Sequence, residues 1–129
     1  MRKIFYLLII CLVLLGCSKD KIDGEVLYKT IENEIASEFV NDGKAILIDV
    51  RSYEEYEKSH IENAINMPLD TISKESLKAV TGSKTENIIV YCQSGARSKE
   101  AAIKIIELGY TNVYDLGSIN NWEIDKGNE

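Results

Sequence analysis

The stretch VYCQSGARS, residues 90–98, decides how this chain is to be interpreted, because it joins two kinds of element around one cysteine. An apolar, β-branched run ends at Tyr91 and is followed at once by Cys92. A short polar turn containing Gly95 comes next, and a helical pattern begins near Arg97. This order of strand, turn and helix predicts a lone thiol at the carboxyl end of a strand.

The turn after Cys92 has the composition of an anion-binding pocket. Backbone N–H groups of a tight turn can converge on one point, and the start of a helix adds partial positive charge there. Both effects favour a thiolate over a thiol. Gly95 allows a backbone torsion that other residues resist, and Arg97 adds a permanent cation. We therefore predict Cys92 as a nucleophile and assign substrate binding to the residues that follow it: Gln93, Ser94, Gly95, Ala96, Arg97 and Ser98.

A buried, inert cysteine followed by an ordinary turn is the second interpretation of this stretch. It accounts for Cys92 and Gly95, but it treats Arg97 and the serines at positions 94 and 98 as coincidence. The local pattern favours the functional interpretation, although a strand, a cysteine, a turn and a helix in succession are not unique to one family.

Short apolar runs alternate with amphipathic stretches from residue 25 onward. This alternation predicts an α/β fold, with a mostly parallel sheet covered by helices on both faces. Binding sites in such sheets form at the carboxyl ends of strands, which is where Asp49 and Cys92 fall. We expect strands at residues 25–29, 45–49, 64–66, 88–91 and 112–115, and helices at residues 32–40, 53–58, 74–79 and 98–108.

The first residues have the pattern of an export signal. Arg2 and Lys3 precede an uncharged run, residues 4–15, which as a helix rises about 18 Å and is too short to span a bilayer comfortably. LLGC, residues 14–17, resembles the lipobox of bacterial lipoproteins, in which the cysteine is lipidated and becomes the new N-terminus. A short membrane anchor that stays attached is the alternative. We expect a signal peptide at residues 1–16, lipidation at Cys17, a tether at residues 17–24 and one domain at residues 25–129.

Processing of this kind would determine the compartment, the charge and the thiol count of the mature chain. Loss of Arg2 and Lys3 changes the formal net charge from −6 to −8, which argues against nucleic acid as a partner. Acyl chains on Cys17 would hold the protein on the outer side of a bacterial membrane, and we expect a monomer there. Cys11 leaves with the signal, so only Cys92 remains as a free thiol.

Two ordered motifs resemble those of the single-domain rhodanese-like sulfurtransferases. One combines VYCQSGARS with NVYDLG at residues 112–117. The other begins with DVR at residues 49–51 and continues through HIENAINMP at residues 60–68. The match covers about residues 26–123. The resemblance implies an α/β domain with a central five-stranded parallel sheet and helices on both faces.

The resemblance also implies a chemistry for Cys92. Its thiolate would attack the outer sulfur of a donor such as thiosulfate, expel sulfite and hold a persulfide. The sulfur would then pass to a thiophilic acceptor, either cyanide or a thiol. This is nucleophilic catalysis by an activated thiol, with loop N–H groups stabilising the charged states. It requires neither a metal nor another cofactor.

Several polar residues upstream have a structural interpretation. We expect Asp49 and Arg51, which follow a buried strand, to form a supporting ion pair, with direct contact to substrate as the alternative. Ser52 and Glu55 have the spacing of a capping box, and Glu55 also stands four positions from Arg51, within reach of a pair. His60, the single histidine, has no neighbouring ligands for a metal, and we expect it to be structural.

The chain departs from the family pattern at positions where glycine is usual. Ser59 and Asn63 stand at two of them, and Gly117-Ser118 stands where a glycine pair is usual. Asn tolerates a positive φ better than Ser does, so we expect Asn63 to fit its turn more easily than Ser59. These positions bear on loop shape more than on chemistry.

Two other functions compete with sulfur transfer. Phosphatases and arsenate reductases of related fold use a Cys-x₅-Arg loop that admits a tetrahedral oxyanion. Here Cys92 and Arg97 form a Cys-x₄-Arg loop, and this smaller cradle suits a sulfur atom. The other competitor is a non-catalytic binding or sensor module on the same scaffold. Inactive relatives typically lose the cysteine, which this chain keeps.

Overall fold

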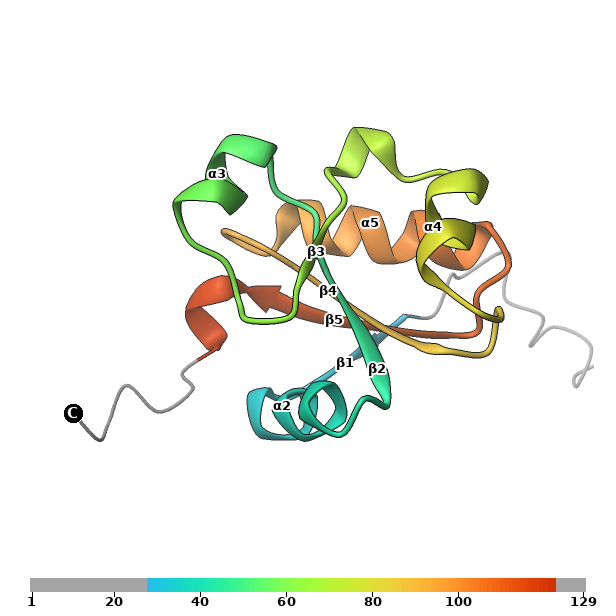
Figure 1. The fold of residues 1–129 in the computed structure, drawn as a ribbon, viewed down its shortest axis with the longest axis horizontal. Helices are drawn as coiled ribbons and strands as arrows, with labels where there is room; N and C mark the ends of the chain where they lie inside the picture. Colours follow the sequence, from blue (N-terminus) through green and yellow to red (C-terminus); the bar gives the residue numbers. More distant parts are fainter. Residues whose placement is uncertain (1–27, 123–129) are drawn as a thin grey trace, which may run out of the picture.

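A five-stranded parallel sheet is the centre of the structure (Figure 1). The computed structural model describes residues 28–122. The strands are β1 (Lys29–Thr30), β2 (Ala45–Asp49), β3 (Ile65–Asn66), β4 (Asn87–Cys92) and β5 (Asn112–Ser118). Their order across the sheet is β1-β5-β4-β2-β3, and every neighbouring pair is parallel. The expected α/β class and the five-stranded parallel sheet are therefore confirmed.

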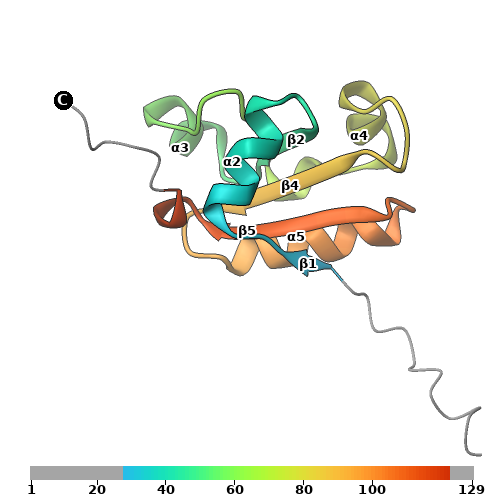
Figure 2. The same ribbon diagram turned by 90° about the horizontal axis from the view of Figure 1, so that it is seen from below.

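Helices cover both faces of the sheet, as predicted. They are α2 (Asn33–Asn41), α3 (Tyr53–Lys58), α4 (Lys74–Val80) and α5 (Ala96–Glu107), with short 3₁₀ turns η2 (Leu69–Thr71) and η3 (Ile119–Asn121). In Figure 1, α4 and α5 lie above the strands and α2 lies below them. The view from below in Figure 2 places α2 in front of the sheet. Two hydrophobic cores result, one on each face.

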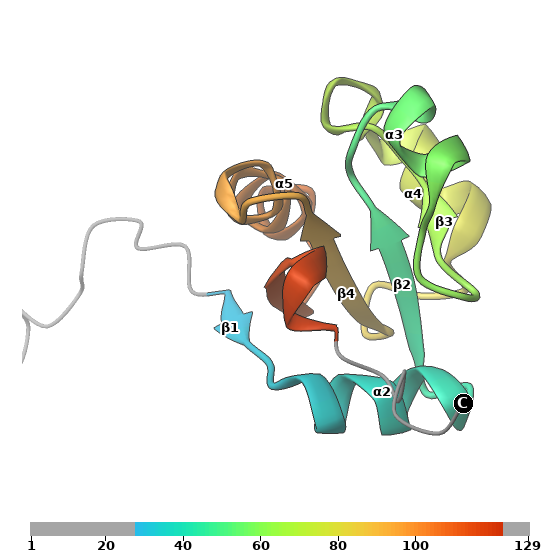
Figure 3. The ribbon, with the colours of Figure 1, turned by 90° about the vertical axis from the view of Figure 1, so that its left-hand side faces the viewer.

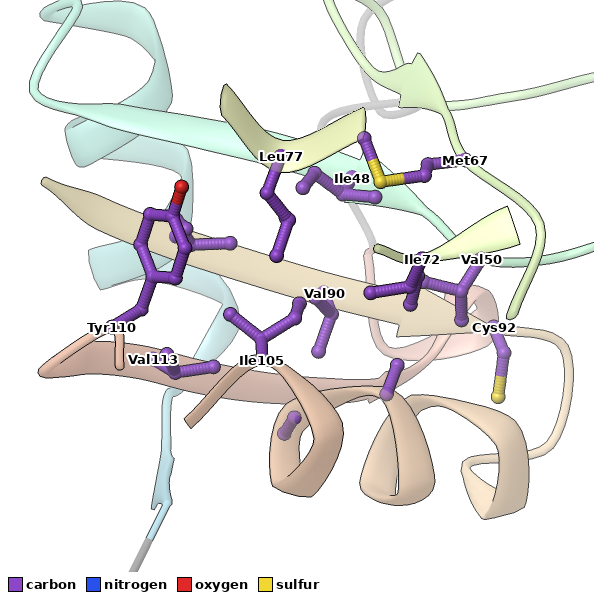
Figure 4. Packing of buried hydrophobic residues seen from close by; sticks show 13 residues of the cluster. Ile48, Val50, Met67, Ile72, Leu77, Val90, Cys92, Ile105, Tyr110 and Val113 are labelled. Atoms are coloured by element: carbon purple, nitrogen blue, oxygen red, sulfur yellow. The ribbon is translucent and has the colours of Figure 1, made fainter. Parts of the chain in front are cut away.

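Alternate residues of β4 pack into these two cores. Ile88, Val90 and Cys92 belong to the core that lies against α4 and α5 (Figure 4), whereas Ile89 and Tyr91 belong to the core that lies against α2. All five are fully buried. Because successive side chains of a strand point to opposite faces, the side chain of Cys92 is directed toward the face on which α5 begins.

Most predicted elements agree closely with the structure. The predicted strand at residues 45–49 and the predicted helix at residues 53–58 coincide with β2 and α3. The expected capping box is present at the start of α3: Ser52 Oγ accepts from the Glu55 N–H at 3.2 Å, and Glu55 Oε1 accepts from the Ser52 N–H at 3.4 Å. Gly109, just after the end of α5, has a φ of 102° and forms a left-handed cap.

Two predicted boundaries within the described residues differ from the structure by more than one residue. The strand expected at residues 112–115 continues to Ser118, because a register shift after Val90 keeps its last residues paired with the end of β4. The helix expected from residue 98 begins at Ala96, since the polar turn before it is shorter than its composition indicates. The strand expected at residues 25–29 lies mostly outside the described residues.

The positions that depart from the family's glycines differ in backbone conformation. Asn63 has a φ of 70°, as expected for a residue that tolerates the left-handed region. Ser59 has a φ of −168°, which is extended backbone open to any residue. The expectation that Ser59 fits its turn less well was therefore wrong, because this turn does not require a glycine.

The predicted export signal at residues 1–16, the lipidation site Cys17 and the tether at residues 17–24 lie outside the described residues. Between residues 28 and 122, no helix has the length and apolar character needed to cross a membrane.

Candidate active site

Cys92 is the last residue of β4, the central strand of the sheet. Its neighbours across the sheet are the ends of β2 and β5, and Cys92 itself is in register with Ser118. Figure 3 looks onto these strand ends, with the first turn of α5 beside them. The side chain is 0% exposed. The thiol therefore lies at the carboxyl edge of the sheet, below the loop that leads to α5.

The loop after Cys92 aims backbone donors at its sulfur. The N–H of Gly95 donates to Sγ at 3.0 Å, and the N–H of Ser98 donates at 3.3 Å. Gly95 has a φ of 100°, a left-handed conformation that favours glycine, and this torsion turns its N–H inward. The hydroxyl of Ser98 donates to the Gly95 carbonyl at 3.0 Å and so ties the turn to the helix. Both N–H groups stand where the helix dipole also favours negative charge.

Gln93, the first residue of the loop, is anchored on two sides. Ser118 Oγ donates to its backbone carbonyl at 2.6 Å, and Arg51 Nη1 donates to its side-chain Oε1 at 3.4 Å. The structure therefore gives Gln93 a part in holding the loop in addition to its expected place at the substrate. The side chains of Ser94 and Ala96 are exposed on the outer surface of the same loop.

Asp49 and Arg51 form the expected ion pair at the end of β2. Arg51 Nη2 lies 2.8 Å from Asp49 Oδ2, and both side chains are almost fully buried. Arg51 also donates through Nε to both carboxylate oxygens and through its backbone N–H to Oδ1. The hydrogen bonds to Asp49 raise the pKa of Arg51, so its guanidinium stays charged. Arg51 Nη2 also donates to the Ser59 carbonyl at 2.6 Å. The pair thus joins β2 to two neighbouring loops.

Tyr91 connects this ion pair to the opposite core. Its hydroxyl donates to Asp49 Oδ2 at 2.7 Å and accepts from the buried N–H of Ile61 at 3.1 Å. Burial, and then the hydrogen bond to the carboxylate, raise the pKa of Tyr91. The phenol is therefore a permanent donor to Asp49 in the functional pH range, and it satisfies a charge that would otherwise be costly to bury.

Arg97, the best candidate for donor binding besides Cys92, is held by a carboxylate. Its Nη1 and Nη2 donate to Glu55 Oε1 and Oε2 at 2.7 and 3.0 Å. The two side chains are about one-third exposed, at 37% and 34%. This bidentate pair joins the first turn of α5 to the first turn of α3. The hydrogen bonds to Glu55 are also the main reason that the pKa of Arg97 is raised.

Glu55 therefore pairs with Arg97 and not with Arg51, the partner that its sequence spacing suggested. Its expected capping role holds, but its ion pair is with Arg97, because Asp49 already occupies the guanidinium of Arg51. The hydrogen bonds from Arg97 lower the pKa of Glu55 to about 2, and those from Ser52 act in the same direction. The carboxylate is thus ionised throughout the range in which proteins normally function.

His60 lies in the exposed segment after α3. Its ring stacks on Tyr56 with a centroid distance of 3.7 Å, and its Nδ1 lies 2.9 Å from the Tyr56 carbonyl oxygen. These contacts agree with the structural role expected for it. Across residues 28–122, no group of three or more His, Cys, Asp and Glu side chains gathers to form a metal site.

The contacts that the sequence did not indicate join residues far apart in the chain. Tyr91 and Asp49 are separated by 42 positions, as are Arg97 and Glu55. The only local signal for Tyr91 was its place one residue before Cys92, which puts it on the opposite face of the strand. Nothing in the sequence indicated that Ser118 contacts the loop, because this contact requires β5 to continue three residues beyond its predicted end.

Comparison with known proteins agrees with this fold. A model of the rhodanese-like domain matches residues 32–125. The chain belongs to the rhodanese-like domain family. A solved rhodanese with anions from E. coli is 35% identical, with a TM-score of 0.57 over 60% of this chain and 89% of that one.

Two further relatives support the fold and the shared domain, respectively. The human single-domain sulfurtransferase TSTD1 is 24% identical, with a TM-score of 0.64 over 74% of this chain and 96% of that one; at this identity the likeness shows the fold alone. A tRNA uridine(34) hydroxylase from Yersinia pestis is 30% identical over 104 residues, or 78% of this chain. The match covers only 29% of that hydroxylase, so the two share a domain rather than a whole architecture.

Proposed function

We propose that this protein is a sulfurtransferase in which Cys92 receives a sulfur atom from a sulfane-sulfur donor such as thiosulfate and passes it to a thiol or to cyanide. The observation that carries the proposal is the pair of backbone N–H groups, from Gly95 and Ser98, directed at the sulfur of Cys92. An inert structural cysteine needs no such donors, whereas a thiolate nucleophile is stabilised by them.

The reaction needs only a thiolate and fixed hydrogen-bond donors. The thiolate attacks the outer sulfur of thiosulfate, a sulfur–sulfur bond forms to Cys92, and the bond to the sulfonate breaks with its electron pair, which releases sulfite. An acceptor thiolate then attacks the outer sulfur of the persulfide and regenerates the Cys92 thiolate. Charge balances in both steps. The N–H groups of Gly95 and Ser98 face negative charge at each stage.

The burial of the sulfur restricts how a donor reaches it. Cys92 is 0% exposed, but Gln93, Ser94 and Ala96 in the loop above it are exposed. A donor therefore meets the loop first, and its outer sulfur reaches Sγ through a local displacement of loop atoms. Exclusion of water around the persulfide is the expected benefit, because it protects the reactive sulfur from hydrolysis and oxidation.

The spacing of Cys92 and Arg97 argues against phosphatase chemistry. Phosphatases of related fold use a Cys-x₅-Arg loop that admits a tetrahedral oxyanion, and the Cys-x₄-Arg loop of this chain is one residue shorter. We therefore expect no turnover of p-nitrophenyl phosphate.

The proposal is tested by following thiocyanate formation from thiosulfate and cyanide. The wild-type chain should turn over, and Cys92→Ser should be inactive. A chain with Cys11→Ala and Cys17→Ala keeps Cys92 as its only cysteine and is the matched control, which should retain activity. A wild-type chain that is folded but forms no thiocyanate with any sulfane-sulfur donor would favour the non-catalytic module.

We also propose that the domain acts outside the cytoplasm, anchored by lipid on Cys17. The support is the LLGC motif at residues 14–17 after an uncharged run. In bacterial cells, a labelled fatty-acid precursor should be incorporated into the wild-type chain and not into Cys17→Ala. Label that persists in this variant would show that the lipobox interpretation is wrong.

A further inference from the structure

Both arginines beside the loop are paired with carboxylates of this chain. Arg97 makes a bidentate contact with Glu55, and Arg51 makes one with Asp49. These are the two arginines between residues 28 and 122. The chain as a whole carries a formal net charge of −6. A doubly charged anion that approaches the loop therefore meets two arginines whose charges are already balanced by carboxylates.

Glu55 is held in this position from two directions. Its carboxylate accepts from Arg97 on one side and from the Ser52 hydroxyl, at 3.1 Å, and the Ser52 backbone on the other. Since its pKa is lowered to about 2, it remains a full negative charge at any pH at which the thiolate can react. The contact thus places a permanent anion next to the cation best placed to attract a donor.

We propose that Glu55 is a specificity-determining residue that selects donors by charge, so that the site accepts a singly charged sulfane-sulfur donor in preference to the thiosulfate dianion. This inference rests on the proposed sulfurtransferase function and concerns the donor class of the same site. The physical reason is that the attraction between a site and an anion grows in proportion to the charge of the anion. By neutralising Arg97, Glu55 removes more attraction from a dianion than from a monoanion.

The chemical step is the same for both kinds of donor. With methanethiosulfonate, which carries one negative charge, the Cys92 thiolate attacks the terminal sulfur. A sulfur–sulfur bond forms to Cys92, and the bond to the sulfonyl group breaks with its electron pair to release methanesulfinate. With thiosulfate the leaving group is sulfite. The two donors thus form the same persulfide, and they differ chiefly in the charge that approaches the loop.

The test compares Glu55→Gln with the wild type for the two donors. The glutamine side chain keeps an oxygen that can accept from Ser52, so the capping box persists while the charge is removed. Glu54→Gln is the matched control, because Glu54 is an exposed neighbour on the same helix and its loss changes the net charge equally. The kcat/KM for methanethiosulfonate and for thiosulfate is measured with cyanide as acceptor, at low and at high salt.

We expect Glu55→Gln to raise kcat/KM by about threefold for methanethiosulfonate and by about tenfold for thiosulfate, because a doubled charge doubles the gain in interaction energy. The difference should shrink at high salt, where exposed charges are screened. Glu54→Gln should leave the ratio of the two donors unchanged. The double variant Glu55→Gln with Arg97→Gln should lose the gain, since the freed guanidinium is its source.

An unchanged donor ratio in Glu55→Gln, or an equal loss with both donors, would overturn this inference and leave Glu55 a structural residue. Neither result would affect the proposed function, because both donors would still form a persulfide. Failure of the proposed function gives a different result: neither donor would support turnover in the wild type or in any of these variants.

Discussion

Arg51 contacts the start of the loop that follows Cys92, and Arg97 lies at the end of that loop, but the environments of the two arginines are opposite. Arg51 is 3% exposed and is fixed by Asp49, by the Ser59 carbonyl and by Gln93. Arg97 is 37% exposed and has a single carboxylate partner, Glu55. One arginine is thus part of a buried network, and the other forms an ion pair at the surface.

This difference in burial gives the two ion pairs different roles. The buried Asp49–Arg51 pair stabilises the structure around the loop, whereas the Arg97–Glu55 pair affects the charge beside the loop. Burial of a charge is costly, and Asp49 is tolerated because it accepts hydrogen bonds from Arg51 and from Tyr91. Removal of one member leaves the others unsatisfied. The Arg97–Glu55 pair is exposed to water and contributes little to stability, so its charges can change at small structural cost. We therefore expect equal chemical changes at the two carboxylates to have unequal effects.

The largest effect on stability is expected from Asp49→Asn. This change removes the charge and leaves the buried guanidinium of Arg51 without a counter-ion, so the free energy of unfolding should fall by about 3–5 kcal/mol. Urea unfolding followed by circular dichroism measures this loss. A loss below about 1 kcal/mol would contradict the view that this pair holds the strand end.

A smaller loss is expected from Tyr91→Phe. The variant removes the donor to Asp49 Oδ2 and the acceptor for the buried Ile61 N–H, while the ring remains in the core. We expect a loss of about 1–3 kcal/mol, because buried polar groups are left unpaired. Tyr53→Phe, at a side chain that is 61% exposed, is the control and should change stability by less than about 0.5 kcal/mol. Equal stabilities of the two variants would mean that the Tyr91 hydroxyl contributes nothing.

The smallest effect on stability is expected from Glu55→Gln, and it should depend on pH. At neutral pH the loss should be about 0.5–1 kcal/mol, because the pair is exposed. The folded-state pKa of Glu55, about 2, lies below its unfolded value, so the stabilisation is complete above the unfolded pKa. It should decline as the pH falls below about 4.5 and be absent once the pH has passed below 2.

Unfolding of the wild type and of Glu55→Gln across this pH range measures the difference directly. Glu54→Gln again provides the control for a change in net charge. A difference between the wild type and Glu55→Gln that stays constant from neutral to acidic pH would show that the charge of Glu55 is not its source.

Most of the fold could be predicted from the sequence, because the local patterns of most strands and helices are strong. β2 is a compact apolar run before Asp49, and α3 begins with a capping box, so both were predicted residue by residue. The end of β5 was missed, since Gly117 and Ser118 lack the apolar pattern of a strand. They are paired only because the register shifts after Val90.

The site could be predicted only as far as local sequence extends. The loop from Cys92 to Ser98 is continuous in the chain, and its composition indicated a nucleophile among backbone donors. The choice of partner for Glu55 could not be made in the same way, because Arg51 is close in sequence while Arg97 is close in space. Which arginine it meets depends on where the fold places α3 relative to the first turn of α5, and that is a property of the folded chain.

The most direct test of the account is the intact mass of the full chain after treatment with a sulfane-sulfur donor. The wild type should gain the mass of one sulfur atom, a thiol or cyanide should remove it, and Cys92→Ser should never acquire it. The variant with Cys11→Ala and Cys17→Ala should gain the same mass, which assigns the sulfur to Cys92. A folded wild-type chain that gains no sulfur from either thiosulfate or methanethiosulfonate would contradict the claim that Cys92 carries a persulfide.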